Sequence, residues 1–487
     1  MSEKIQQEAR GSTKLALKAG LWYVISNFLV RSMSFLTTPI FTRLLSTEQY
    51  GEFSNFASWL TLLVIVAGAE LHNTLNRAYY DFKEDFNQYV STVTVASCLL
   101  TAVMYGLFLL CGKWIYTIVN IPPAYVHILF FMMMCQSCKT IFVARERTLY
   151  RYKTVAALSV FIVAVPTLIA VALVSALPEA QRLDARIYGT YVPMALVGLM
   201  CGMILIKQGK RFNTKYLKYA FTLALPLLLH YLTAHLLTSS DAIITKAVLG
   251  AEAVSVVSVA TSVNHIVTIL LQSVSGALMT WLMDNMEQNK EKAVRRGTFL
   301  YVGGIMLVTL AVIFVAPEIV WVLGGSKYAA SAYLLPGMAV AAMVQSSTTV
   351  FTIMLTYKKK VAGTAVYTAV VSVLCIVAKI WLLPIFGVQC IPYVNMAAFA
   401  VLFLVNYLLV CKAGCKKMIS IKGMLIVLAI AFAVMLLSPV LYAANTVRYS
   451  VIGVCFVAVC IAAYIKRDMV KTLLQKMLKK KKTAGTK

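Results

Sequence analysis

The chain has 487 residues, of which 60% are hydrophobic and 13% charged, whereas a soluble domain carries about a quarter charged residues. The mean hydropathy is +0.81, and apolar stretches long enough to span the hydrocarbon core as helices recur along the chain. The net charge of +27 does not indicate nucleic-acid binding, because the basic residues stand in short segments between these stretches. The composition excludes a soluble protein and predicts an all-α polytopic membrane protein, since the alternation of barrel strands is missing.

The first apolar stretch is predicted to be a retained membrane helix. The polar start, MSEKIQQEARGSTKLALKAG, is followed by no small-residue cleavage site, and the apolar run after it is longer than a signal-peptide core. The connections between apolar runs are too short to fold as domains, so any activity is expected inside the helical bundle. About fourteen transmembrane helices are expected, at 17–40, 53–75, 89–111, 123–144, 154–176, 188–208, 218–240, 253–276, 298–317, 331–356, 361–383, 388–411, 421–443 and 447–465.

The distribution of basic residues predicts the orientation in the membrane. Most of the 45 Lys and Arg residues fall on the side of the predicted spans that includes both ends of the chain, and such residues accumulate on the cytoplasmic side. Both termini are therefore expected in the cytoplasm, as an even number of spans requires. The basic residues expected on the external side are Arg43, Lys113, Arg182, Arg186, Lys246, Lys327 and Arg448.

A weak internal repeat with an offset of 203 residues places Thr38 on Asp241 and Arg43 on Lys246. The offset covers six predicted spans, an even number, which is typical of parallel repeats; chance matching of apolar helices is the alternative. The expected division is an N-terminal six-helix lobe at 1–212, a C-terminal six-helix lobe at 213–418, two appended transmembrane helices at 419–465 and a basic cytoplasmic tail at 466–487.

Arg31 stands in the middle of the first predicted span. Thirteen and twelve residues separate it from the basic residues at either boundary, which is roughly 20 Å and roughly 18 Å of helix. A guanidinium cannot easily reach either interface from there. Either it pairs with a carboxylate on another span or it faces a hydrated cavity; its depth favours a cavity that would attract phosphate. The polar residues on the same helical face are Asn27, Arg31, Ser34 and Thr38.

Other polar residues inside the predicted spans are candidates for cavity lining or ion coupling. Each has a simpler interpretation: Lys379 could extend to the outer interface, Asp241 could cap its helix, and Glu70 could pair with a neighbouring helix. Single histidines in apolar helices are usually packing residues, and their spacing matches no metal site. The motif CQSC at 135–138 is interpreted as small buried residues, not as a redox or metal motif. The candidates are Glu70, His72, Asn73, His230, Asp241, Asn264, His265 and Lys379.

The opening of the chain resembles a known family of membrane proteins. The residues KAGLWYVISNFLVRSMSFLTTPIFTRLLSTEQYGEFSNFASW at 18–59, with the turn at 39–45, Glu-x-Tyr-Gly at 48–51 and NRAYYDF at 76–82, resemble Wzx-type polysaccharide-biosynthesis flippases. These flippases belong to the multidrug/oligosaccharidyl-lipid/polysaccharide exporter superfamily and translocate O-antigen or capsule repeat units. Beyond about the first hundred residues the likeness is mainly topological.

The resemblance implies a bacterial inner-membrane transporter, not an enzyme, with two lobes around a cationic central cavity. The implied partner is an undecaprenyl-diphosphate-linked glycan, flipped from the cytoplasmic to the external leaflet with Arg31 at its diphosphate. No cofactor is implied, and coupling to a proton or sodium gradient would involve Glu70, Asp241 or a histidine. Anionic membrane lipids are expected partners of the basic tail, and polysaccharide polymerase machinery is a further candidate partner.

Two other functions stay open. A multidrug cation antiporter of the same superfamily would need acidic groups deep in its cavity, whereas the deepest charge here is Arg31. An integral-membrane polysaccharide polymerase or glycosyltransferase would need large external loops or carboxylates at the outer surface. The short segment 177–187, which contains Glu179 and Asp184, is the only candidate for such a surface.

Overall fold

The computed structural model describes residues 35–119, 121–358, 360, 362–450 and 452–453, and these form helices and short connections without a strand. Residues 35–44 and 445–450 are helical. Eleven segments of the described chain are long and apolar enough to cross a membrane, one of which covers both α13 and α14. The long helices are α3 (Thr47–Gly68), α5 (Phe86–Val119), α6 (Pro123–Thr148), α7 (Tyr152–Ala176), α8 (Arg182–Gly209), α9 (Thr214–Leu249), α10 (Ala251–Glu287), α11 (Glu291–Gly324), α12 (Ser331–Tyr357), α13 (Ala362–Phe386), α14 (Cys390–Lys412) and α15 (Ile421–Ala443).

The structure confirms the prediction of an all-α polytopic membrane protein. Most of the expected spans correspond to one long helix each, and those expected at 17–40 and 447–465 lie mostly outside the described residues. Short helices occupy the connections: α4 (Leu75–Asp81), η2 (Leu71–Thr74), η3 (Glu179–Gln181), η4 (Ser326–Tyr328), η5 (Gly387–Gln389) and η6 (Lys416–Met418).

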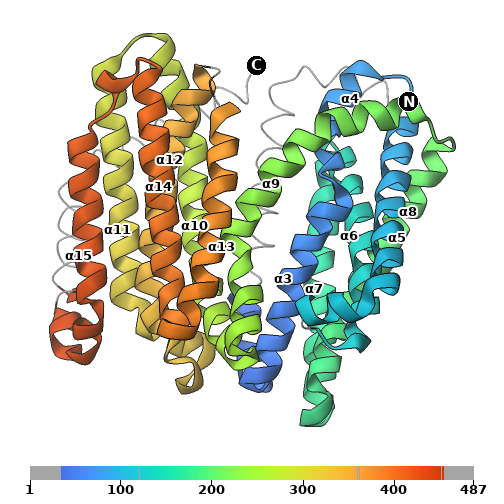
Figure 1. Cartoon of the computed structure of the whole chain (residues 1–487), viewed down its shortest axis with the longest axis horizontal. Coiled ribbons are helices and arrows are strands. Elements are labelled where there is room, and N and C mark those ends of the chain that lie inside the picture. Colours follow the sequence, from blue (N-terminus) through green and yellow to red (C-terminus); the bar gives the residue numbers. More distant parts are fainter. Residues whose placement is uncertain (1–34, 120, 359, 361, 451, 454–487) are drawn as a thin grey trace, which may run out of the picture.

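The long helices form two bundles, one made of α3 to α8 and the other of α10 to α15 (Figure 1). Helix α9 runs between them and packs against α3 on one side and α13 on the other. Helices α3 and α10 are also in contact. These three helices therefore join the bundles. We call the end of the molecule that carries α4 the α4 end, and the opposite end, which carries η4, the η4 end.

Helix α3 begins and ends earlier in the chain than the span predicted at 53–75. It begins after Ser46, whose hydroxyl accepts a hydrogen bond from the Gln49 backbone N–H while the Gln49 side chain accepts one from the Ser46 N–H, a capping box. It ends at Gly68, because Ala69 and Glu70 both have positive φ, 44° and 53°. The span predicted at 53–75 was therefore wrong at both ends.

Small residues allow close helix packing inside the N-terminal bundle. A Cβ at Gly198 of α8 would lie 2.3 Å from the backbone oxygen of Cys135 on α6, so the two helices touch through backbone at this point. Cys135 and Cys138 are buried there, with the Cys138 Sγ 3.6 Å from the Cys98 Sγ. The described chain contains no group of three metal-binding side chains. The two cysteines of the CQSC motif are buried packing residues, as the sequence predicts.

Candidate functional site: a cavity between the two bundles

Two adjoining cavities lie along α9 and α10, with volumes of about 430 and 520 Å³. The first lies between the two bundles, with walls from residues 37–41, α3 and α8 on one side and α9 and α10 on the other. The second extends into the C-terminal bundle as far as α12 and α14. Together they form a continuous polar space, because five residues line both: His235, Ser239, Asp241, Thr261 and His265.

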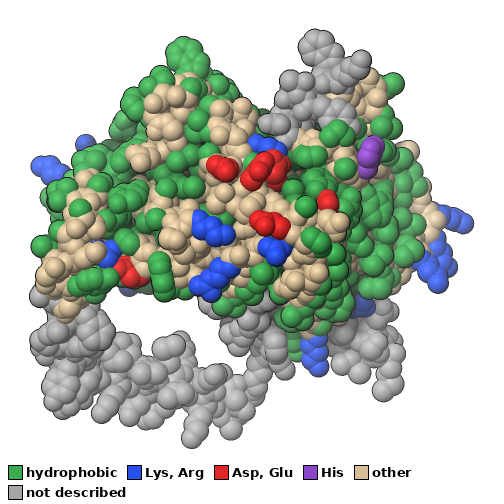
Figure 2. Space-filling model, turned by 90° about the horizontal axis from the view of Figure 1, so that it is seen from below, with side chains coloured by type: hydrophobic (Ala, Val, Ile, Leu, Met, Phe, Trp, Pro, Cys, Tyr) green, Lys and Arg blue, Asp and Glu red, His purple; other side chains and the backbone are tan. Residues whose placement is uncertain are grey.

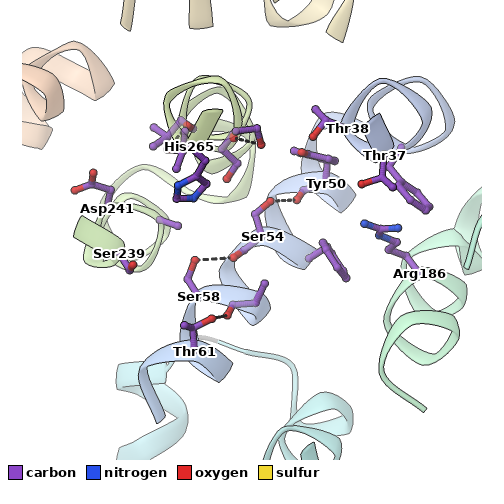
Figure 3. A pocket seen from close by; sticks show the side chains of 18 of the residues that line it. Thr37, Thr38, Tyr50, Ser54, Ser58, Thr61, Arg186, Ser239, Asp241 and His265 are labelled. Atoms are coloured by element: carbon purple, nitrogen blue, oxygen red, sulfur yellow. Dashed lines mark hydrogen bonds between the residues drawn. The ribbon is translucent and has the colours of Figure 1, made fainter. Parts of the chain in front are cut away.

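Arg186 contributes a cation to the first cavity. It comes from the second turn of α8, and Figure 3 shows its guanidinium directed toward α3. The guanidinium carbon lies 3.1 Å from the ring centre of Phe41 and 4.3 Å from that of Phe53, and the faces of two aromatic rings stabilise such a cation. Its Nε is buried without a hydrogen-bond partner, and none of the ion pairs in the described chain includes it. Arg186 is thus held in place without being neutralised.

Hydroxyl groups cover the α3 wall of the cavity. Ser54, Ser58 and Thr61 follow one another along α3 (Figure 3), and each donates to the carbonyl four residues earlier at 2.7–2.8 Å. On the facing helix α10, the hydroxyls of Thr261 and Ser262 do the same at 2.8 and 2.9 Å. Each hydroxyl has used its one proton. These oxygens therefore face the cavity as hydrogen-bond acceptors.

Asp241 is the acidic residue in the described lining, and it is already paired. Its Oδ1 lies 2.5 Å from the Nζ of Lys379, and its Oδ2 accepts a hydrogen bond from the Asn395 amide at 2.9 Å. Lys379 is fully buried, with 0% of its surface exposed. The interpretation of Lys379 as a side chain that reaches the interface was therefore wrong. Asp241 is not a helix cap either, because α9 continues to Leu249.

The charges on the described lining leave the cavity with a net positive character. Arg186 and Asp241 are its charged lining residues, and the pair with Lys379 neutralises Asp241. The guanidinium of Arg186 has no such counter-charge among the described residues. An anion entering the cavity would meet one uncompensated cation and a wall of hydroxyl acceptors.

The cavity is closed at the η4 end by contacts between the bundles. The Thr42 hydroxyl donates to the Leu323 carbonyl at 2.5 Å, and Lys327 Nζ donates to the carbonyls of Thr42 and Leu45 at 3.1 and 3.3 Å. Lys246 on α9 pairs with Glu52 on α3 at 2.5 Å. Figure 2 shows acidic and basic side chains gathered over the middle of this face. These hydrogen bonds and this salt bridge can all break when the two bundles move apart.

Helices α3 and α10 meet with almost no space between them at the same end. A Cβ at Gly51 would lie 1.8 Å from the carbonyl oxygen of Ala251. Only a glycine permits this approach of one backbone to another. The contact adds a steric seal to the polar contacts of the η4 end.

Comparison with known proteins assigns the family. The family model described as "Polysaccharide biosynthesis protein" matches residues 16–286, which is more than half of the chain. The chain belongs to the polysaccharide biosynthesis protein family. A search of curated protein sequences finds no match.

Solved structures share the fold of this polysaccharide biosynthesis protein. The lipid II flippase MurJ, in an inward closed conformation, is similar with a TM-score of 0.71 at 13% identity, over 92% of this chain and 99% of MurJ. The MATE multidrug transporter DinF-BH has a TM-score of 0.57 at 13% identity, over 82% of this chain and 96% of the transporter. An inward-facing MATE transporter of the MOP superfamily has a TM-score of 0.54 at 14% identity, over 81% and 99%. The fold is therefore that of flippases and multidrug transporters.

In this polysaccharide biosynthesis protein, several of the residues predicted from sequence line the two cavities. Thr38 and Asp241, which the repeat places on one another, both line the first cavity, and Asn264 and His265 line the second. Lys379 does not line either cavity, but it forms an ion pair with the lining residue Asp241. The residues Asn27, Arg31 and Ser34, and the side chain of His230, lie outside the part that the structure describes.

Three predicted residues lie elsewhere in this family member. These residues are Glu70, His72 and Asn73, at the 3-10 helix η2 beyond the end of α3. They line neither of the two cavities along α9 and α10. The Asn73 amide donates to Glu70 at 2.6 Å, and the His72 Nε2 lies 3.8 Å from the same carboxylate. The expectation that Glu70 pairs with a neighbouring helix was wrong, because its partners are on its own turn.

Arg186 is the functional candidate that the sequence did not reveal. Its position at the start of an apolar run placed it in an external connection, but α8 begins at Arg182 and includes it. Arg182 donates to the Leu44 carbonyl at 2.8 Å, which fixes the start of α8 against the segment that carries Phe41. The spacing of these two arginines, four residues apart on one helical face, is the signal in the sequence.

Proposed function

We propose that this protein flips a polyprenyl-diphosphate-linked oligosaccharide, such as an O-antigen or capsule repeat unit, from the cytoplasmic to the external leaflet of the bacterial inner membrane. The α4 end would face the cytoplasm together with both termini. The observation that carries the proposal is Arg186, a cation held in the inter-bundle cavity by two phenyl rings, with no carboxylate partner in the part of the chain that the structure describes. A diphosphate supplies the missing negative charge.

The chemistry of the cavity suits both parts of such a head group. A guanidinium offers planar donors that match phosphate oxygens. The hydroxyl oxygens of Ser54, Ser58 and Thr261 present acceptors, and sugar hydroxyls are donors that can fill them. Neither a charge nor unpaired hydroxyls can cross hydrocarbon unaided. The polyprenyl chain would stay in lipid while the head group crosses through the protein.

Transport would proceed by alternating access, with the two bundles rocking about the cavity. The contacts at the η4 end hold the cavity closed on the side proposed to be external. Most of them are bonds from single side chains: Thr42 and Lys327 bond to the facing bundle, and Lys246 of α9 bonds to α3. Their rupture would open the site outward. Polysaccharide polymerase machinery would then receive the repeat unit at the external surface.

Proton or sodium coupling remains part of the proposal. Among the described lining residues, Asp241 is the carboxylate that could respond to an ion, and its partners are Lys379 and Asn395. The same pairing argues against a multidrug cation antiporter, because a carboxylate bonded to a buried lysine offers little charge to a cationic drug. The likeness to MATE transporters supports only the shared fold.

A flux measurement tests the proposal. The purified full chain is placed in vesicles with an undecaprenyl-diphosphate-linked oligosaccharide, and the fraction of glycan accessible to an external lectin is followed with time. We expect accessibility to rise with the protein and not with empty vesicles. A cationic dye loaded in parallel should not be transported; dye transport without glycan flipping would contradict the proposal.

Arg186→Gln is expected to lower the flux roughly 10- to 100-fold, because a hydrogen bond to a charged group is worth about 1.5–3 kcal/mol. Arg186→Lys retains the charge and should lose less. The matched control is Arg77→Gln, since Arg77 is an exposed arginine paired with Asp81 outside the cavity. Full flux in Arg186→Gln would remove the assigned role.

A further inference from the structure

A third polar pocket lies at the α4 end of the N-terminal bundle, away from the cavity between the bundles. It has a volume of about 380 Å³ and is enclosed by η2, α4, α6 and α7. It shares no residue with the two cavities described above. Its polar lining consists of His72, Asn73, Asn76, Lys139, Thr140, Arg147 and Ser159.

Helix α6 contributes two cations to this pocket. Lys139, Val143 and Arg147 line it at intervals of four residues, and therefore lie on one face of the helix. Nine residues separate Lys139 from Thr148, where α6 ends, which is about 14 Å of helix. The backbone of Lys139 is thus well inside the apolar span. Its side chain lines this small polar pocket.

No carboxylate neutralises Lys139 in the described chain, because none of the ion pairs there includes it. The acid that follows on α6, Glu146, already pairs with Arg145 at 2.6 Å and Arg151 at 3.7 Å. Glu70 is bonded to Asn73, and burial raises the pKa of Glu70, which favours its neutral form. A cation inside a protein is costly without a counter-ion, so the pocket is suited to an anion.

Two neutral groups of the pocket, Asn76 and His72, can act as donors, whereas the Thr140 hydroxyl donates to the Gln136 carbonyl at 2.8 Å and leaves an acceptor. The Asn76 Oδ1 already accepts a hydrogen bond from the Thr148 hydroxyl at 2.8 Å, which leaves its amide N–H groups to donate. Burial and the nearby Arg147 lower the pKa of His72 to about 4, so the ring is neutral at pH 7 and carries one N–H donor. Two cations together with the donors of Asn76 and His72 match the oxygens of a phosphate.

We propose that this pocket binds the phosphate group of an anionic phospholipid in the leaflet at the α4 end. Helix α7 forms one wall, and only 17% of its span is buried, the lowest share among the candidate spans of the described chain. Beside Ser159 it exposes Val160 and Phe161, with 47% and 49% of their surfaces free. Acyl chains can cover this apolar surface while the phosphate enters between α6 and α7. A free phosphate shares the chemistry but not the apolar contact.

The test measures lipid binding to the full chain in a neutral detergent. Thermal unfolding is followed with added phosphatidylglycerol, phosphatidylcholine or inorganic phosphate, because a ligand that binds the folded state raises the Tm; native mass spectrometry counts the bound lipids. We expect phosphatidylglycerol to raise the Tm and phosphatidylcholine to have a much smaller effect. Lys139→Gln and Arg147→Gln should each weaken phosphatidylglycerol binding at least tenfold.

The matched control is Lys153→Gln, which removes an exposed cation near the same end of α7 and does not line the pocket. It should bind phosphatidylglycerol as the wild type does. Lys139→Arg, which keeps the charge, should retain binding and shows that a loss in Lys139→Gln does not come from misfolding. Unchanged binding in both glutamine variants would overturn the site, and a response to inorganic phosphate alone would overturn the lipid assignment. None of these outcomes depends on flipping activity.

Discussion

A short covalent link between residues 52 and 246 is expected to reduce flipping at least tenfold. Glu52 of α3 and Lys246 of α9 form a salt bridge of 2.5 Å across the η4 end. In a Glu52→Cys/Lys246→Cys variant, a cleavable bifunctional thiol reagent of similar span would join α3 of the N-terminal bundle to the end of α9, which leads through Gly250 directly into α10 of the C-terminal bundle. Alternating access requires this end to open, so the linked protein should retain its fold but stop transporting, and a reductant should restore the flux.

Single-cysteine variants at the same two positions are the controls. Each loses one partner of the salt bridge and can react with the reagent, but neither can form the link. The chain has eleven cysteines of its own, so these variants also report any effect of labelling elsewhere. If the doubly substituted, linked protein flips at the full rate, the η4 end does not open during transport.

Asp241→Asn is expected to lower the free energy of unfolding by about 3–5 kcal/mol, because removing one partner of a buried ion pair leaves the other charge uncompensated. The stranded group is Lys379, which is fully buried and bonded to the Asp241 carboxylate at 2.5 Å. Thermal unfolding in detergent measures the loss. The matched control is Asp81→Asn, which breaks an exposed pair with Arg77 and should change the Tm far less.

A second substitution separates the buried charge from other effects of the change at Asp241. In Asp241→Asn/Lys379→Met the unpaired ammonium is gone, and an apolar side chain fills its place. Most of the lost stability should return, since apolar replacements of buried ion pairs are often neutral. If flux remains low while stability recovers, the pair also serves transport. An Asp241→Asn protein as stable as the wild type would contradict the ion pair.

The sequence predicts the helices of this protein well because the signals for them are local. Apolar runs of about twenty residues define most spans within a few residues, and the capping box at Ser46 and Gln49 can be read directly from its spacing. The sequence did not predict the backbone break at Ala69 and Glu70, two residues of positive φ that end α3. This break places His72 in a different pocket from the one expected.

The sequence did not predict which polar residues meet in the cavity between the bundles. The depth of Arg31 indicated a cavity with a cation, and the cation that the structure describes in the inter-bundle cavity is Arg186, from a segment that the sequence placed in a connection. Its ring partners, Phe41 and Phe53, lie more than a hundred residues away in the chain. No pattern within one helix specifies such neighbours.

The amino-acid sequence by itself determined that this chain is a polytopic helical membrane protein, because hydrophobicity over twenty residues is enough to favour a span in lipid. It also predicts two repeated halves, from an offset of 203 residues that would pair positions such as Thr38 and Asp241. Only the tertiary structure decided which polar groups meet. Whether a charge is neutralised, as Lys379 is by Asp241, or has no ion-pair partner among the described residues, as at Arg186 and Lys139, depends on helices brought together by packing. It does not depend on the residues beside it in the chain.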